Sequence, residues 1–159
     1  MVVDDECDTR EVLRDILADD GIRVLLASNG RECLRKAGLD VSAILLDVMM
    51  PSVDGVTVCR CLRDNPCTRD IPVIFLTACQ GEQLEAAAGE AGAFDFLLKP
   101  VRAGELRAKV QAAVRLDRLL DPVSRRAAYE RLVAEGRRAQ EQEEAQLDER
   151  MDRASLMEE

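Results

Sequence analysis

The stretch LLDVMMPSVDG, residues 45–55, decides how the rest of this sequence is interpreted. It overlaps an apolar run, SAILLD at residues 42–47, whose nearly continuous hydrophobic character is typical of a strand covered on both faces. Asp47 ends that strand. The proline and glycine that follow predict a turn into a helix beginning near Gly55. A single carboxylate is therefore expected at the carboxyl end of a buried strand.

Alternating strand and helix patterns continue on both sides of this stretch. Strands are predicted at residues 1–3, 22–27, 42–47, 71–77 and 94–98, and helices at residues 7–20, 30–37, 55–63, 82–90 and 103–120. Five strand–helix units in alternation predict an α/β fold, with a doubly wound parallel sheet and helices on both faces. In open sheets of this class, ligands bind beyond the carboxyl ends of the strands.

Polar side chains stand at the carboxyl ends of several predicted strands. They are Asp4, Asp5, Asp47, Thr77 and Lys99. Three carboxylates close together repel one another unless a cation lies between them, and Mg²⁺ favours carboxylates combined with water and a phosphoryl group. Lys99 and Thr77 would add a positive charge and a hydroxyl donor for phosphoryl oxygens. The set predicts phosphoryl transfer to an aspartate, with Asp47 as the nucleophile because it lies on the central strand.

Composition limits the other possibilities. The 159 residues suffice for one domain and an appendage, while a net charge of -9 and 3% aromatic residues oppose nucleic-acid binding. No apolar run approaches the roughly 20 residues that span a bilayer and no signal segment is recognised, so we expect a cytoplasmic protein without a membrane partner. Six scattered cysteines and no histidine predict buried thiols rather than zinc ligands or disulfides.

Four segments together resemble the receiver domain of two-component response regulators. In chain order they are VVDDE at residues 2–6, LLDVMMPSVDG at residues 45–55, IPVIFLTA at residues 71–78 and AFDFLLKP at residues 93–100. The resemblance implies a flavodoxin-like sheet with strand order 2-1-3-4-5, in a receiver domain of residues 1–121. The family usually has several more residues before Asp4, so we expect a shortened first strand and a less stable fold, for which a misassigned start codon is one explanation.

The same resemblance implies a nucleophile, a metal and a partner. Asp47 would accept a phosphoryl group from a phosphohistidine on a sensor histidine kinase or a histidine phosphotransfer protein. Asp5 and Asp47 would bind Mg²⁺ directly, Met49 would add its backbone carbonyl, and Asp4 would act mainly through water. The chain would catalyse only its own phosphorylation and dephosphorylation, so it is not expected to be an enzyme in the usual sense.

The resemblance also implies a switch. Thr77 and Lys99 would hold phosphoryl oxygens, and Phe96 occupies the aromatic position whose ring moves inward as the threonine is drawn to the phosphate. Because phenylalanine lacks the hydroxyl of the commoner tyrosine, the two ring positions are expected to differ mainly in apolar burial. The partner surface would be the face of the fourth helix, fifth strand and fifth helix.

Residues 122–159 differ in character from the rest, with no strand signal and many Glu, Arg, Gln and Ala residues. We expect a helical extension without a recognisable output domain, and a homodimer formed either through it or through the face named above. Residues 120–140 faintly resemble the opening helix of a diguanylate cyclase domain, without its signature motif, so a catalytically dead or truncated cyclase is the alternative. A haloacid-dehalogenase-type phosphatase would require an aspartate where Met49 stands.

Overall fold

The computed structural model describes residues 1–38, 40–78 and 82–119. Within them, five strands alternate with five helices in the predicted order. In chain order they are β1 (Val2–Val3), α1 (Cys7–Ala18), β2 (Leu26–Ala27), α2 (Gly30–Lys36), β3 (Ile44–Asp47), α3 (Gly55–Asp64), β4 (Val73–Thr77), α4 (Glu82–Glu90), β5 (Asp95–Leu98) and α5 (Ala103–Leu119). The extension expected at residues 122–159 lies outside the described residues and stays a prediction.

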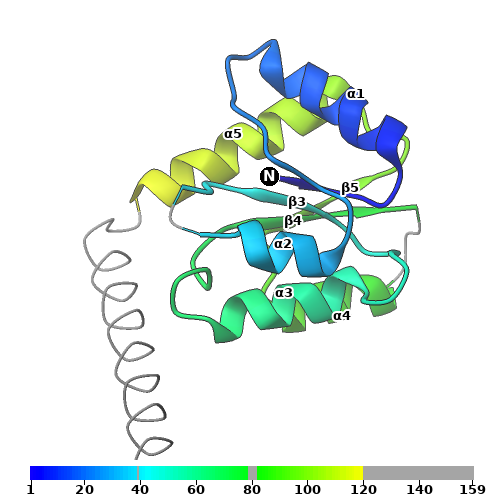
Figure 1. Cartoon of the computed structure of the whole chain (residues 1–159), viewed down its shortest axis with the longest axis vertical. Helices are drawn as coiled ribbons and strands as arrows, with labels where there is room; N and C mark the ends of the chain where they lie inside the picture. The colour runs from blue at the N-terminus through cyan, green and yellow to red at the C-terminus, as the bar shows by residue number, and fades with distance from the viewer. Residues whose placement is uncertain (39, 79–81, 120–159) are drawn as a thin grey trace, which may run out of the picture. The chain divides into compact units, whose positions relative to one another are not determined.

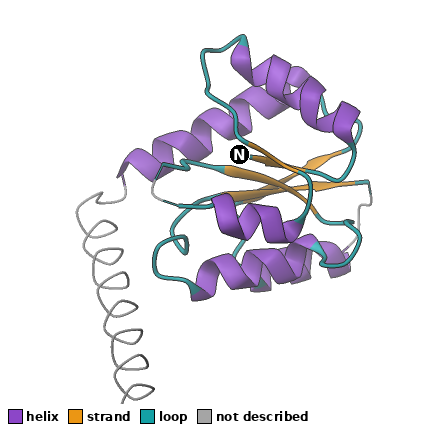
Figure 2. Ribbon diagram, in the orientation of Figure 1, coloured by secondary structure: helices purple, strands orange, loops and turns teal. Residues whose placement is uncertain are grey.

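The five strands form one parallel sheet in the order β2-β1-β3-β4-β5 (Figure 1). Helices α1 and α5 cover one face of the sheet, while α2, α3 and α4 cover the other (Figure 2). Helices α1 to α4 each connect two consecutive strands across a face of the sheet, as parallel pairing requires. The predicted doubly wound, flavodoxin-like fold is confirmed.

The predicted range of the second strand was too long. β2 comprises Leu26–Ala27 instead of residues 22–27. Its neighbour β1 offers only Val2 and Val3 for pairing, and these lie opposite Leu26 and Ala27. A strand forms where a neighbouring strand supplies the ladder hydrogen bonds, so the apolar pattern of residues 22–25 is not sufficient alone.

Alternation along the central strands divides the core into two layers. In β4, Val73 and Phe75 pack toward α2, α3 and α4, while Ile74 and Leu76 pack toward α1 and α5. All four side chains are at most 1% exposed. Both faces of β4 are therefore apolar, which explains why its sequence reads as a continuous hydrophobic run.

The cysteines follow the faces of their helices. Cys33, Cys59 and Cys67 are buried as predicted, whereas Cys7 and Cys61 are exposed, and all five are reduced. Cys61 follows Cys59 by two positions on α3, so the two side chains point in different directions. Exposure of Cys7 and Cys61 corrects the expectation that the thiols are buried; Cys79 lies outside the described residues.

A single arginine of α3 joins two connections on the same side of the sheet. Arg63 donates from Nε and one terminal nitrogen to the carbonyl of Gly92, at 3.0 and 2.9 Å. Its other terminal nitrogen donates to the carbonyls of Arg69 and Ile71, at 2.7 and 2.9 Å. The planar guanidinium thereby satisfies backbone oxygens in the α3–β4 connection and in the turn after α4.

Arg63→Ala is expected to lower the free energy of unfolding by about 2 kcal/mol, since hydrogen bonds from a charged donor contribute about 1.5–3 kcal/mol and three carbonyls lose their donor. Chemical denaturation monitored by circular dichroism measures the change. The matched control is Arg60→Ala, which removes an exposed arginine from the same helix and is expected to change stability by less than about 0.5 kcal/mol. Equal effects of the two substitutions would contradict the assignment.

Candidate phosphoacceptor site

Three carboxylates meet at the carboxyl edge of the sheet. Val2 and Val3 of β1 pair with Leu45 and Leu46 of β3, so Asp4, just after β1, and Asp47, the last residue of β3, lie side by side. One carboxylate oxygen from each of the residues Asp4, Asp5 and Asp47 lies within 4.8 Å of the other two. Asp4 is 0% exposed and Asp47 is 4% exposed, while Asp5 faces solvent. The cluster predicted from separate strand ends is confirmed as a spatial group.

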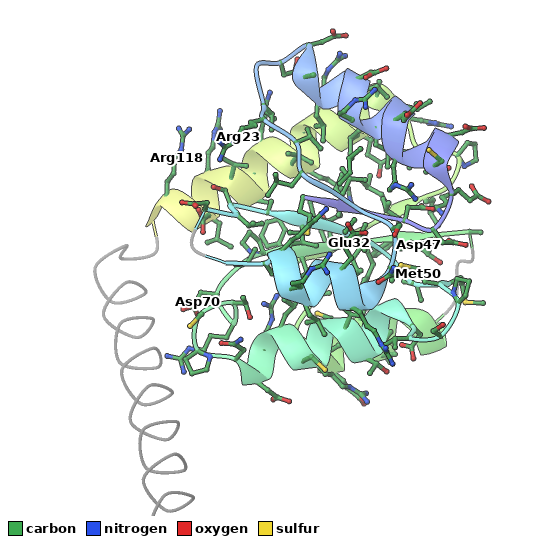
Figure 3. The ribbon with its side chains drawn as sticks, in the orientation of Figure 1. Arg23, Glu32, Asp47, Met50, Asp70 and Arg118 are labelled. Atoms are coloured by element: carbon green, nitrogen blue, oxygen red, sulfur yellow. The ribbon has the colours of Figure 1, made fainter. Side chains whose placement is uncertain are left out.

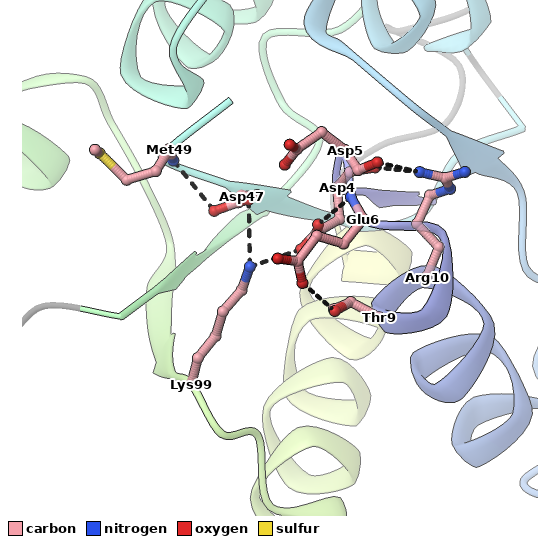
Figure 4. Close-up of polar contacts among 8 residues, drawn as sticks. All are labelled: Asp4, Asp5, Glu6, Thr9, Arg10, Asp47, Met49 and Lys99. Atoms are coloured by element: carbon pink, nitrogen blue, oxygen red, sulfur yellow. Dashed lines mark hydrogen bonds and ion pairs between the residues drawn. The ribbon is translucent and has the colours of Figure 1, made fainter. Parts of the chain in front are cut away.

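Lys99 brings a positive charge into the same cluster. Its backbone N–H donates to the carbonyl of Thr77 at 2.8 Å, which fixes the residue just beyond the ends of β4 and β5. Its ammonium nitrogen lies 2.8 Å from Asp4 Oδ2 and 3.2 Å from Asp47 Oδ2 (Figure 4). One lysine therefore bridges the two buried carboxylates, although β5 is two strands away from β3.

The two methionines after Asp47 have different environments. Met49 donates its backbone N–H to Asp47 Oδ1 at 3.1 Å and leaves its side chain 74% exposed. Met50 turns into the core and is 8% exposed; Figure 3 shows it beside Asp47, at the end of the sheet opposite Asp70 and Arg118. Met49 thus orients the carboxylate through its backbone, while its side chain is free of the cluster.

The environment of Asp47 disfavours its charged form. Burial, the largest effect, raises the pKa of Asp47, and the hydrogen bond from the Met49 N–H lowers it. The charge of Asp4 raises the pKa further, whereas Lys99 lowers it. The pKa of Asp47 is raised overall. For Lys99, burial lowers the pKa, but the hydrogen bond and charge of Asp4 together with Asp47 outweigh burial and raise it. The lysine is therefore firmly protonated, and a further cation at the cluster would favour the ionised aspartate.

The remaining predicted residues lie close to this edge. Thr77 is the last residue of β4 and is 2% exposed, one position beyond Leu76, which pairs with Asp47. Phe96 lies on β5, three residues before Lys99, where its backbone pairs with Phe75 and its side chain packs half-buried against the core. Thr77 belongs to the polar edge, whereas Phe96 lies outside the carboxylate cluster.

Sequence reasoning did not identify the residues that hold the acidic loop after β1. Arg10 on α1 donates to the carbonyls of Asp4 and Asp5, at 2.6 and 3.1 Å (Figure 4). The backbone N–H of Glu6 donates to Asp4 Oδ1 at 2.9 Å. An arginine six positions after Asp4 and five after Asp5 is the only signal in the sequence, and that spacing does not distinguish it from an ordinary arginine of a helix.

Gly55 has a different role from the one its sequence context suggested. The sequence indicated a glycine that lets the chain turn toward α3. In the structure its N–H donates to the carbonyl of Val48 at 3.0 Å. A Cβ atom on residue 55 would overlap the carbonyl oxygen of Asp47 and lie 2.9 Å from Val48 Cα. Glycine is therefore required for close approach of two backbone segments at the site.

The donor set suits a small divalent cation. Three carboxylates from two adjacent loops supply hard oxygen atoms, one of them on an exposed residue that leaves room for water. Burial is the largest cause of the raised pKa of Asp47, and the nearby charge of Asp4 adds to it, so a cation bound at the cluster would oppose both effects. These residues fit Mg²⁺ better than a thiolate-binding or imidazole-binding metal, since no cysteine or histidine joins the group among the described residues.

The parallel sheet, the acidic cluster and the bridging lysine define an α/β signalling domain of the two-component type. The chain belongs to the response regulator receiver domain family, whose profile matches residues 1–111. The class expected from four sequence segments is thereby confirmed.

Curated and solved relatives agree with this membership. Response regulator PleD of Caulobacter vibrioides is 40% identical over 129 residues, which cover 80% of this chain but 28% of PleD. A response regulator structure from Chloroflexus aurantiacus is 34% identical, with a TM-score of 0.67, and the match covers 72% of this chain and 94% of that one.

A third relative contains a metal. The receiver domain of a sensor histidine kinase from Pseudomonas aeruginosa PAO1, solved with a magnesium ion coordinated in its active-site cleft, is 31% identical, with a TM-score of 0.65. The match covers 71% of this chain and 93% of that one. The chain spans 28% of the length of PleD, so the comparison concerns less than a third of that protein. In the part of the chain that the structure describes, no helix has the length and apolar character needed to cross a bilayer.

Proposed function

We propose that this protein accepts a phosphoryl group on Asp47 from a phosphohistidine of a sensor histidine kinase or a histidine phosphotransfer protein, in a Mg²⁺-dependent reaction. The observation that supports this most directly is the position of the Asp47 carboxylate: buried at a strand end, hydrogen-bonded by Met49 and bridged to Asp4 by Lys99. The membership of the family and the magnesium-containing relative support it further.

The reaction follows from the chemistry of these groups. A carboxylate oxygen of Asp47 forms a bond to phosphorus while the bond from phosphorus to the partner's imidazole nitrogen breaks, and the imidazole keeps that electron pair. Lys99 places its ammonium where negative charge gathers on the phosphoryl oxygens, and Thr77 offers a hydroxyl. Asp4, Asp5, Asp47 and the Met49 carbonyl would hold Mg²⁺, which when bound neutralises charge on the carboxylates and the phosphoryl group.

The output of this reaction is a change in an interaction surface. We propose that Thr77 and Phe96 couple the phosphorylated site to the face formed by α4, β5 and α5. In this proposal residues 1–121 are the receiver domain and residues 122–159 an extension without its own catalytic chemistry. Partners are a phosphohistidine protein and, through that face or the extension, a second copy of the chain.

Incubation of the whole chain with acetyl phosphate and Mg²⁺ tests the assignment. Intact mass spectrometry should show an increase equal to one phosphoryl group, absent with a chelator and absent in Asp47→Asn. The matched control is Asp54→Asn in the same loop: Asp54 caps α3 by accepting from the Thr57 N–H at 2.9 Å, and asparagine caps equally well. This control should be labelled normally. An unlabelled wild type, or a labelled Asp47→Asn, would refute the proposal.

The loss of labelling in Asp47→Asn should not reflect unfolding. Burial raises the pKa of Asp47 in the folded protein. At any pH above this folded pKa, ionisation of Asp47 lowers the folding stability. This cost disappears once the pH falls below the ordinary pKa of an aspartate in the unfolded chain. The neutral asparagine avoids this cost. We therefore expect Asp47→Asn to melt at or above the wild-type temperature in Mg²⁺-free buffer at neutral pH.

A further inference from the structure

Strand β5 lies at the edge of the sheet, and one lysine of α5 reaches around that edge. The outward backbone groups of an edge strand have no neighbouring strand to bond. Lys109 donates to the carbonyl of Phe96 at 2.9 Å and to Asp95 Oδ1 at 2.7 Å, while Asp95 Oδ1 also accepts from the Phe96 N–H at 2.7 Å. The lysine and the aspartate together satisfy both outward backbone groups of Phe96.

The same ammonium stands over the aromatic ring. Lys109 Nζ lies 5.3 Å from the centroid of Phe96, within the range of a cation–π interaction. Glu105, one turn earlier on α5, lies 3.8 Å from the ammonium and supports its position. The Lys109 side chain is 24% exposed, so solvent weakens these contacts only in part.

We propose that Lys109 is a positioning residue for the switch, holding the Phe96 ring in the partly buried position that it has in this structure, in the unphosphorylated protein. The anchors of the ammonium are Asp95 and the backbone of Phe96, neither of which depends on the ring's rotamer. An inward rotation of the ring would therefore leave the ammonium in place and break only the cation–π contact. The cation–π contact is therefore present in one ring position and absent in the other. Such a difference between the two states is required of any interaction that shifts a two-state equilibrium.

This inference deepens the proposed function. The link between Lys109 and phosphorylation rests on the proposal that Asp47 is the phosphoacceptor. Phenylalanine has no hydroxyl to stabilise an outward ring, so apolar burial alone would favour the inward position. The ammonium supplies the opposing interaction. Because coupling between sites is reciprocal, an interaction that holds the ring outward also disfavours phosphorylation.

Ring positions can be measured without phosphorylation. The chain contains three phenylalanines, so ring-¹³C-labelled phenylalanine gives three sets of signals, and Phe96→Leu assigns those of Phe96. In Lys109→Met, which keeps the apolar stem, the Phe96 ring should shift and become less accessible to a soluble gadolinium chelate. The ring of Phe75, 1% exposed, should not change. Unchanged Phe96 signals would overturn the proposal whether or not Asp47 is the phosphoacceptor.

The coupling is measured with limiting acetyl phosphate and Mg²⁺ on the whole chain. Lys109→Met should be phosphorylated about twofold to fivefold faster than wild type, the range that one cation–π contact corresponds to. Arg115→Met, an exposed residue on the same helix, makes the same charge change and should have no effect. In a Phe96→Leu background, Lys109→Met should lose its effect. Acceleration that persists without the ring, or equal acceleration by Arg115→Met, would overturn the proposal, and so would a shifted ring with an unchanged rate.

Discussion

Replacing Lys99 with methionine is expected to slow phosphorylation of Asp47 by about a hundredfold, the typical effect of removing one charged or hydrogen-bonding group that stabilises a transition state. Two consequences of the substitution act in the same direction. The phosphoryl oxygens lose the ammonium proposed to hold them, and the buried carboxylates of Asp4 and Asp47 lose the cation that bridges them at 2.8 and 3.2 Å. The pKa of Asp47, already raised by burial, should rise further.

The dependence on pH separates these two consequences. A higher pKa for Asp47 moves the acid side of the rate profile to higher pH, because the nucleophile must be ionised. The rate with acetyl phosphate, followed by intact mass from weakly acid to weakly alkaline pH, should therefore recover in part as pH increases. At high pH, where Asp47 is fully ionised in both proteins, any remaining difference in rate between Lys99→Met and wild type measures the direct role of the ammonium.

A matched control distinguishes the site from a general loss of positive charge. Lys36 also forms an ion pair, with Glu32 at 2.7 Å, but it lies on α2 and donates to the carbonyl of Leu26. Lys36→Met should therefore be phosphorylated at the wild-type rate. Mg²⁺ should also raise the melting temperature of Lys99→Met more than that of wild type, since the variant leaves more carboxylate repulsion to relieve. A wild-type rate in Lys99→Met would rule out the proposed role.

Replacing Gly55 with alanine is expected to lower the free energy of unfolding by about 3 kcal/mol, at the upper end of the range for overpacking in a close-packed interior. The added methyl group would meet backbone, the carbonyl of Asp47 and the Cα of Val48, and backbone cannot rotate away as a flexible side chain can. Relief would require β3 and the start of α3 to separate. That movement would shift Asp47, so phosphorylation should also slow.

Urea denaturation measures the first effect, with a lower midpoint and an unchanged slope. The chain offers a direct control in Gly104, the second residue of α5, where an added Cβ meets nothing within 4 Å. Gly104→Ala should be neutral or stabilise the fold by up to about 1 kcal/mol, because alanine favours helix more than glycine does. Equal midpoints for Gly55→Ala and wild type would show that the two segments can separate at little cost.

The proposed switch at Phe96 involves an interaction that the side chain alone did not suggest. Without a hydroxyl, phenylalanine was expected to choose between its two positions mainly through apolar burial. The structure adds a polar contribution from outside the residue, since the Lys109 ammonium stands over the ring and is anchored by the strand that carries it. A helix on one face of the sheet thereby influences a ring that packs against the core on the other face.

The sequence by itself determined the order of elements, the parallel sheet and the group of residues at its carboxyl edge. These features depend on local periodicity and on the rule that parallel strands end at the same edge, so Asp4, Asp5, Asp47, Thr77 and Lys99 could be grouped before any distance was known. Strand length was less certain, because β2 extends only as far as β1 pairs with it.

Only the tertiary structure decided which groups touch. Lys99 could have paired with any acid at the edge, and its bridge to Asp4 and Asp47 depends on side-chain reach across two strands. The overlap at Gly55 and the contact of Lys109 with Phe96 likewise join residues through space, where no pattern of spacing records them. Periodicity specifies the face and the edge on which a residue lies, whereas contacts of a few ångströms depend on how the elements pack.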